Sequence, residues 1–389
     1  MKKIIALVLV LCMALSLCAC GGKTEKETEN TVKIGVFEPL SGDNGAGGKQ
    51  EVLGMQYANA VHPTVEIGGK TYNVELVVAD NESSTDKAVS AATKLTAAGC
   101  SIVLGTYGSA VAIAASDTFA EAGVTALGVT CTNPQVTAGN NHYFRICFLD
   151  PFQGTVHANF AKDLGAKTAY CLGQLGNDYD QGLINYFKEA AEAMGMTVIV
   201  DSFTEGNSDF NSYLTNAKNA GAEVIFAPVS ISYAQLIIDQ VAAQGLDIPL
   251  LGSDTWDSNV ILEAAKGKDV DIYVSTFYQE GADESFEKGL KEWINADANN
   301  LANNNGDDTI SAVTVMGYDA YMTALAAMQA AGSVDKADIL AKMPSVTYTG
   351  VTGLIAFDEV GDAKRDTAVI KSANTEAGVW EFYATQSVG

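Results

Sequence analysis

Two runs of alternating apolar and amphipathic segments govern what this chain can fold into. Short apolar segments such as VKIGVF (32–37) and EVIFAPV (223–229) are each followed by a longer segment with helical spacing. Buried strands that alternate with helices are typical of right-handed βαβ units, whose strands form parallel sheets. Because the pattern occurs in two runs, the sequence predicts an α/β fold with two doubly wound lobes.

The pattern also predicts the individual elements. The expected strands are VKIGVF, a strand pair in TVEIGGKTYNVELVVAD, IVLG, TALGV, TAYCLG, TVIVDSF, EVIFAPV and IPLLGS. The expected helices cover 49–61, 86–98, 110–122, 182–194, 209–220 and 234–245. LDPFQG (149–154) stands between the two runs, and we interpret it as the crossover.

The regular alternation of strands and helices ends after residue 277. We expect an amphipathic helix at 284–296, the polar loop NADANNLANNNGDD, a long helix at 311–331, a shorter helix to 343 and then strands. This tail has too few strands for a third domain, so we expect it to complete both lobes. The first lobe would comprise 32–150 and 278–360, and the second 151–277 and 361–389.

The N-terminus has the features of an export signal. A basic MKK precedes the apolar stretch IIALVLVLCMALSL, which has signal-peptide length. The following LCAC resembles the bacterial lipobox, whose last cysteine is lipidated after cleavage. On this interpretation residues 1–19 are a lipoprotein signal peptide, Cys20 carries the lipid, and 20–31 form a flexible tether. A plain secretory signal with a stray cysteine is the alternative.

Composition excludes several classes of function. The net charge of −24 repels nucleic acid and anionic membranes, so we expect neither as a direct partner. Beyond the signal region, Cys100, Cys131, Cys147 and Cys171 have no CxxC spacing, and only three histidines occur. We therefore expect no metal site and no cofactor. Buried free thiols are preferred over disulfides for these cysteines, although export would permit pairing.

The turn GTYGSA (105–110) follows a buried strand and opens a helix, which is where ligands bind in open α/β sheets. It lacks the lysine of a phosphate-binding loop, the third glycine of a dinucleotide fingerprint and the GxSxG of a hydrolase elbow. Thr106, Ser109 and the amides of 108–110 would suit a small carboxylate at a helix N-terminus. The alternative is that Ser109 only caps the helix.

Two further turns have related chemistry. GVTCTNPQVT (128–137) offers Thr130 and Thr132, and adjacent parallel strands would place it beside the first turn. LGSDTWDSN (251–259) places Asp254 after a strand of the second run. Hydroxyls on one lobe and a carboxylate on the other would suit a zwitterion, with its carboxylate on the first and its ammonium on the second.

Motifs in the same order over the whole length resemble a known family. They are KIGVFEPLSG, VLGTYGSAVAIAASDTFAEAGV, VTCTNPQVT, FRICFLDPFQG, LGNDYDQGL, AAQGLDIPLLGSD and GYDAYMTALAAM. From about residue 32 onward the chain resembles the solute-binding proteins of branched-chain amino-acid ABC transporters, the leucine/isoleucine/valine-binding type. The resemblance implies a type I periplasmic-binding-protein fold, with two Rossmann-like lobes joined by three hinge crossovers.

The resemblance also implies roles for particular residues. The ligand carboxylate would be held by Ser109 and Thr132, with backbone groups at Tyr107 and Thr130. The ligand ammonium would meet Asp254.

Relatives also carry a ligand-contacting tyrosine in the loop of the second lobe, which corresponds to Tyr179. Relatives often have a tyrosine where this chain has Gly47, so the side-chain pocket departs from the family pattern. Phe37, Glu38 and Trp256 could refill it. Simple packing is the alternative for Trp256, and a supporting loop carboxylate is the alternative for Glu38.

The expected function is that of an extracytoplasmic binding lipoprotein, held at the outer face of the cell membrane by its lipid alone. It would be a monomer that captures a branched-chain or other aliphatic amino acid and delivers it to an ABC permease, with no enzymatic activity. The alternatives are the same fold binding an amide, an aromatic acid or an organic acid for transport or sensing, and an enzyme.

Overall fold

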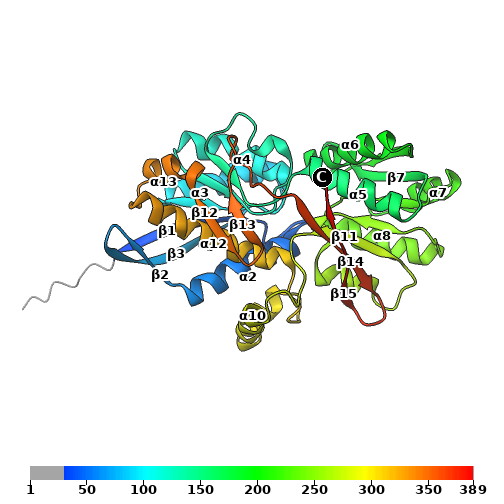
Figure 1. Ribbon diagram of the computed structural model, residues 1–389. Coiled ribbons are helices and arrows are strands. Elements are labelled where there is room, and N and C mark those ends of the chain that lie inside the picture. The colour runs from blue at the N-terminus through cyan, green and yellow to red at the C-terminus, as the bar shows by residue number, and fades with distance from the viewer. Residues whose placement is uncertain (1–29, 389) are drawn as a thin grey trace, which may run out of the picture.

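The computed structural model describes residues 30–388, which form two lobes, each around its own sheet (Figure 1). The first sheet has the order β2-β3-β1-β4-β5-β6, and its strands are β1 (Thr31–Glu38), β2 (Thr64–Ile67), β3 (Lys70–Asp80), β4 (Ile102–Leu104), β5 (Thr125–Gly128) and β6 (Tyr143–Arg145). Its pairs are parallel except for β2 with β3.

The second sheet has the order β15-β14-β11-β10-β9-β7-β8. Its strands are β7 (Thr168–Gln174), β8 (Thr197–Phe203), β9 (Val224–Phe226), β10 (Leu250–Gly252), β11 (Ile272–Thr276), β14 (Thr367–Asn374) and β15 (Val379–Ser387). β14 pairs antiparallel with both β11 and β15 at one edge, and the other pairs are parallel. The predicted α/β fold with two parallel-sheet lobes is confirmed.

Helices pack around both sheets (Figure 1). In the first lobe they are α2 (Gly45–Val61), α3 (Thr85–Ala97), α4 (Ser109–Glu121), α12 (Ala312–Ala331) and α13 (Lys336–Lys342). In the second lobe they are α5 (Asp150–Asp163), α6 (Asp178–Ala193), α7 (Asn211–Asn219), α8 (Ile231–Gln244) and α9 (Asn259–Ala265). α10 (Glu284–Ala296) and α11 (Ala298–Asn303) precede α12, and the hairpin β12 (Thr347–Gly350)–β13 (Gly353–Ala356) follows α13.

Three expectations need correction. β6 was not expected, and α5 begins at Asp150, so the connection between the lobes is shorter than LDPFQG; Pro151 stands in the first turn of α5, where its fixed φ suits a helix. The polar segment after α10 is not all loop. The Asp297 side chain accepts a 2.7 Å hydrogen bond from the Asn299 amide and so caps the short helix α11.

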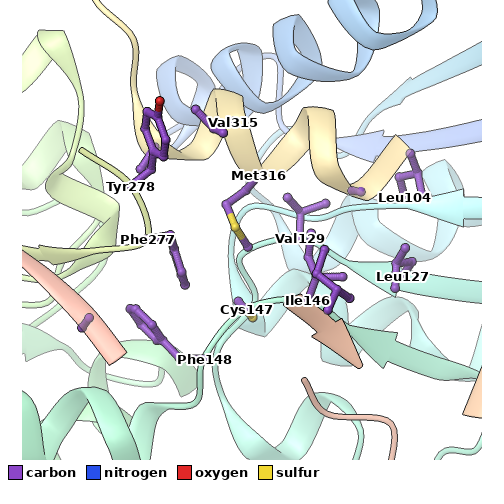
Figure 2. Packing of buried hydrophobic residues seen from close by; sticks show 14 of the residues in the cluster. Leu104, Leu127, Val129, Ile146, Cys147, Phe148, Phe277, Tyr278, Val315 and Met316 are labelled. Atoms are coloured by element: carbon purple, nitrogen blue, oxygen red, sulfur yellow. The ribbon is translucent and has the colours of Figure 1, made fainter. Parts of the chain in front are cut away.

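The chain passes between the sheets three times: after β6, after β11 and before β14. On the first two passages Phe148 and Phe277 stack with ring centroids 4.1 Å apart, close to Cys147 and to Met316 of α12 (Figure 2). The third passage is held by the buried ion pair of Arg145 with Asp362 at 2.6 Å. The exact lobe boundaries, 32–150 with 278–360 and 151–277 with 361–389, stay a prediction.

The four cysteines of the described residues, Cys100, Cys131, Cys147 and Cys171, are buried and unpaired, as expected. Burial raises the pKa of each thiol, to about 11 for Cys100 and about 12 for Cys131. The thiol therefore predominates over the thiolate at neutral pH, and these side chains pack as small apolar groups.

Candidate functional site

A cavity of about 210 Å³ lies between the two lobes. Loops and helix starts from both sheets line it, at the carboxyl ends of the parallel strands, as expected for this class of fold. The lining residues are Asp43, Asn44, Ser83, Ser84, Thr85, Asp86, Tyr107, Gly108, Ser109, Ala110, Val111, Thr130, Gln174, Leu175, Gly176, Asn177, Tyr179, Asp180, Glu205, Ser230 and Thr255.

Ser109 begins α4 at the wall of this cavity. The helix cap is Gly108, at a φ of 112° that favours glycine, and no side chain caps the helix. The alternative that Ser109 only caps the helix is therefore wrong. Its hydroxyl oxygen instead accepts a 3.1 Å hydrogen bond from the Asn133 amide, which ties the first turn to the second.

The second turn lies beside the first because β4 and β5 pair in parallel, as expected. Thr130 lines the cavity, and its hydroxyl donates to Glu51 of α2. Thr132 is fully buried, and its hydroxyl makes no hydrogen bond of ordinary geometry among the described residues, although the buried Asp150 carboxyl is near enough to interact with it. A buried hydroxyl without a partner is uncommon in native proteins, because burial without a hydrogen bond costs free energy.

Asp254 begins the short 3-10 helix η2 (Asp254–Trp256) after β10 in the second lobe. Its Oδ1 accepts hydrogen bonds from Gln153 Nε2 at 2.7 Å and from the Tyr179 hydroxyl at 2.8 Å. Burial raises the pKa of Asp254 to about 6, and the two hydrogen bonds oppose that rise. Asp254 is therefore largely ionised at neutral pH, and it lies behind Tyr179 of the cavity wall, positioned by two neutral donors.

A pair of buried carboxyls stands behind the site in the first lobe. Glu38 accepts a 2.7 Å hydrogen bond from the Tyr107 amide, and one oxygen of each of Glu38 and Glu51 has no partner among the described residues. Burial, followed by repulsion from Glu51, raises the pKa of Glu38 well above its usual range. Burial raises the pKa of Glu51 to about 7. Glu38 thus supports the loop of Tyr107 and does not line the cavity.

Tyr107 occupies the space that Gly47 leaves open. A Cβ atom added at Gly47 would lie 2.5 Å from the Tyr107 ring carbon Cζ. The Tyr107 hydroxyl donates a 2.7 Å hydrogen bond to the Thr255 carbonyl of the second lobe. The Tyr107 ring can therefore take this position only because residue 47 has no side chain. Spacing within the sequence does not reveal this dependence.

The structure brings most of the predicted site residues together. Four of them line the cavity: Tyr107, Ser109, Thr130 and Tyr179. Asp254 is buried and bonded to Tyr179, and Thr132 is buried two residues after Thr130.

Neither Phe37 nor Trp256 lines the cavity, so nothing supports the expectation that they refill the pocket; Thr132 and Asp254 do not line it either, although Asp254 accepts a hydrogen bond from Tyr179, which does. The Phe37 ring packs edge-on against Phe119 at 5.4 Å. The Trp256 indole donates to the Val229 carbonyl at 3.1 Å and covers Gly252. Both are packing residues, which for Trp256 was the alternative.

Sequence reasoning missed Gln153, Glu51 and Asp180. Gln153 and Asp180 stand within DPFQG and NDYDQG, two segments that belong to the family-like motifs of the sequence. Glu51 is an acidic residue on the buried side of α2, and this mismatch with its surroundings is the signal that could have found it.

Comparison with known proteins decides the family. The family model for periplasmic binding proteins matches residues 31–376. This chain belongs to the periplasmic binding protein family. A Leu/Ile/Val-binding protein homolog 3 of Brucella melitensis is 30% identical over 338 residues, which is 85% of this chain and 88% of the relative.

Two solved structures extend the comparison. The leucine binding protein LivK of Thermotoga maritima has a TM-score of 0.81 at 30% identity, covering 92% of this chain and 99% of the other. The branched-chain amino acid transporter substrate binding protein LivJ of Streptococcus pneumoniae, in complex with isoleucine, has a TM-score of 0.75 at 26% identity, covering 92% and 99%. This periplasmic binding protein is thus a solute-binding protein of the Leu/Ile/Val-binding family with the type I fold.

Membership places the chain in a class of extracytoplasmic transport proteins that bind a substrate. Among residues 30–388 no helix is both long and apolar enough to cross a bilayer. The predicted signal peptide and Cys20 lie outside the described residues.

Proposed function

We propose that this solute-binding protein captures a small α-amino acid between its lobes and delivers it to an ABC permease, without catalysing a reaction. One observation supports the proposal: hydroxyls of Ser109 and Thr130 line the first-lobe side of the cavity, and Tyr179, whose hydroxyl donates to buried Asp254, lines the second-lobe side.

The ligand carboxylate would meet Ser109, Thr132 and the backbone at Tyr107 and Thr130. The start of α4 supports this, since it carries no acidic residue in its first turn and its unpaired amides suit an anion. The unpartnered Thr132 hydroxyl would gain an acceptor. The ligand ammonium would meet Asp254, beside Tyr179. The names of the relatives favour a branched-chain or other aliphatic side chain.

Calorimetric titration of the purified mature domain with the twenty amino acids and with amides, aromatic acids and organic acids tests this function. We expect saturable 1:1 binding of at least one L-amino acid. Binding of an amide or of an organic acid alone would replace the amino-acid assignment, and turnover of any probe would replace the non-catalytic one.

We further propose that Cys20 carries a lipid that holds a monomeric protein at the outer face of the cell membrane. A diacylglyceryl group anchors stably, whereas a single acyl chain anchors only marginally. In the Cys20→Ser protein we expect release into the medium with unchanged ligand binding. Retention of that variant in the membrane pellet would remove the lipoprotein assignment. Sedimentation of the released protein tests the monomer.

A further inference from the structure

The cavity wall is more hydrophilic than an aliphatic ligand requires. Among its lining residues only Ala110, Val111 and Leu175 have aliphatic side chains beyond glycine. Burying an aliphatic side chain contributes about 0.8 kcal/mol per CH₂, but only where it replaces water by apolar contacts. Against hydroxyls, amides and carboxylates, an aliphatic chain would strip water from polar groups and return no hydrogen bonds.

The formal charges of the wall have one sign. Its acidic residues are Asp43, Asp86, Asp180 and Glu205, and no lysine, arginine or histidine lines it. Two cations near the site are already paired: Arg145 with Asp362 at 2.6 Å, and Lys371 with Asp257 at 2.9 Å. The cavity therefore offers acceptors for positive charge and no side-chain cation for a second negative charge.

Asp180 is a specific acceptor for a positively charged group of the ligand. Its side chain is 1% exposed, and its Oδ2 accepts a 2.8 Å hydrogen bond from the Gln174 amide. Its Oδ1 has no partner among the described residues. A buried carboxyl oxygen without a partner is costly, and burial raises the pKa of Asp180 to about 8, so a cationic donor on the ligand would remove a penalty and favour the ionised carboxylate.

The helix starts at the cavity support the same polarity. α3 and α6 each carry an acidic residue in the first turn, Asp86 in one and Asp178 with Asp180 in the other. These acids offset the positive ends of the two helix dipoles. The start of α4 has none and stays available to the ligand carboxylate.

We propose that the ligand is a cationic amino acid, whose side chain ends in an ammonium or guanidinium group that binds Asp180 at the second-lobe wall of the cavity. This inference rests on the proposed capture of an α-amino acid, and it replaces the aliphatic side chain that the names of the relatives favour with a cationic one. Exposed Asp86 and Glu205 add a negative rim, which attracts cations from solution.

The decisive comparison uses L-lysine and L-norleucine. Both have a four-carbon side chain, and only that of lysine ends in an ammonium group. We expect L-lysine or L-arginine to bind the wild-type protein at least about tenfold more tightly than L-norleucine or L-leucine. Equal or tighter binding of L-leucine or L-norleucine overturns the inference and leaves the proposed function standing, as does preference for L-glutamate. If no amino acid binds, the proposed function fails, and the inference fails with it.

A variant pair then tests Asp180 itself. Asp180→Asn keeps the size of the side chain and an acceptor for the Gln174 amide but removes the charge. We expect the preference for lysine over norleucine to fall about tenfold, with norleucine affinity unchanged. Asp178→Asn removes the same charge from the same turn of α6 at an exposed position that does not line the cavity. It should leave both affinities unchanged. Equal losses for both ligands in Asp180→Asn, or the same loss of preference in Asp178→Asn, would overturn the assignment of Asp180.

Discussion

Tyr107 and Thr255 join the two lobes across the cavity, through a 2.7 Å hydrogen bond from the tyrosine hydroxyl to the threonine carbonyl. Both residues are buried, at 2% and 7% exposure, so the bond is shielded from water in the closed protein. Opening the lobes would break it. The hydrogen bond therefore stabilises the closed arrangement of the lobes. Because the ligand binds between the closed lobes, its affinity depends on this stabilisation.

Tyr107→Phe removes this bond and leaves the Thr255 carbonyl without its donor. The net loss of about 1–1.5 kcal/mol should weaken ligand binding about tenfold, mainly through faster release. Stopped-flow measurement of ligand dissociation checks the expectation. Tyr321→Phe is the control within one lobe, because the Tyr321 hydroxyl donates a 2.7 Å bond to the His62 carbonyl and accepts one from Asn59, all in the first lobe. A similar change in release rate for both variants would show that the lobe-bridging position is irrelevant.

Ser109→Ala and Thr132→Val test the carboxylate site. Each substitution deletes a hydroxyl that would donate to a charged group in a closed cleft, which is worth about 1.5–3 kcal/mol. We expect affinity to fall about ten- to a hundredfold in each variant. Ser109 does not cap α4, so its replacement should cost little stability through the helix. Wild-type affinity in both variants, measured by calorimetry, would remove these residues from the site.

The buried carboxyls make stability depend on pH in a defined direction. The folded protein holds the Glu51 proton up to a pKa of about 7, against an ordinary value of 4.5. Between these values the folded state binds more protons than the unfolded state, so the free energy of unfolding falls as pH rises. Burial raises the pKa of Asp150 to about 7 and of Asp180 to about 8, so these two groups also make the free energy of unfolding fall as pH rises.

Glu51→Gln should therefore flatten the decline in the stability of the ligand-free protein between about pH 4.5 and 7. Urea unfolding at a series of pH values measures it. The comparison with wild type isolates Glu51 from His157, whose pKa burial lowers to about 3 and whose contribution has the opposite slope between about pH 3 and 6.5. A variant whose slope equals or exceeds that of the wild type would contradict the raised pKa.

Much of the fold could be predicted because buried parallel strands are short, apolar and followed by helices. This pattern predicts β1, β9 and their neighbouring strands. β6 has three residues, Tyr143–Arg145, and one of them is a buried arginine that pairs with Asp362, distant in sequence, and donates to carbonyls of the turn after β5. Local pattern does not contain that partner, and so it does not reveal the strand.

The same distinction holds for the site residues: those fixed by local sequence could be predicted, and those fixed by contacts between distant segments could not. The turns of Ser109 and Thr132 were found because strand ends and helix starts are visible in sequence. Phe37 and Trp256 were misplaced, because an aromatic residue next to a site motif reads the same whether it faces the cavity or the core. The partnership of Gly47 with Tyr107 depends on two loops meeting in space, and no spacing rule predicts it.

The central claim is that Asp254 receives the ammonium of an α-amino acid, and titration of Asp254→Asn tests it most directly. The variant keeps the size of the side chain but leaves the ligand ammonium desolvated without a counter-ion, a loss of about 3–5 kcal/mol. Affinity for the L-amino acid should fall by roughly two to four orders of magnitude. The des-amino analogue, a plain carboxylic acid, should bind wild type poorly and lose little or even gain in the variant. Calorimetry measures both, and the nearby Trp256 offers a fluorescence signal. A variant that binds the amino acid as tightly as wild type, or a wild type that prefers the des-amino acid, would contradict the account.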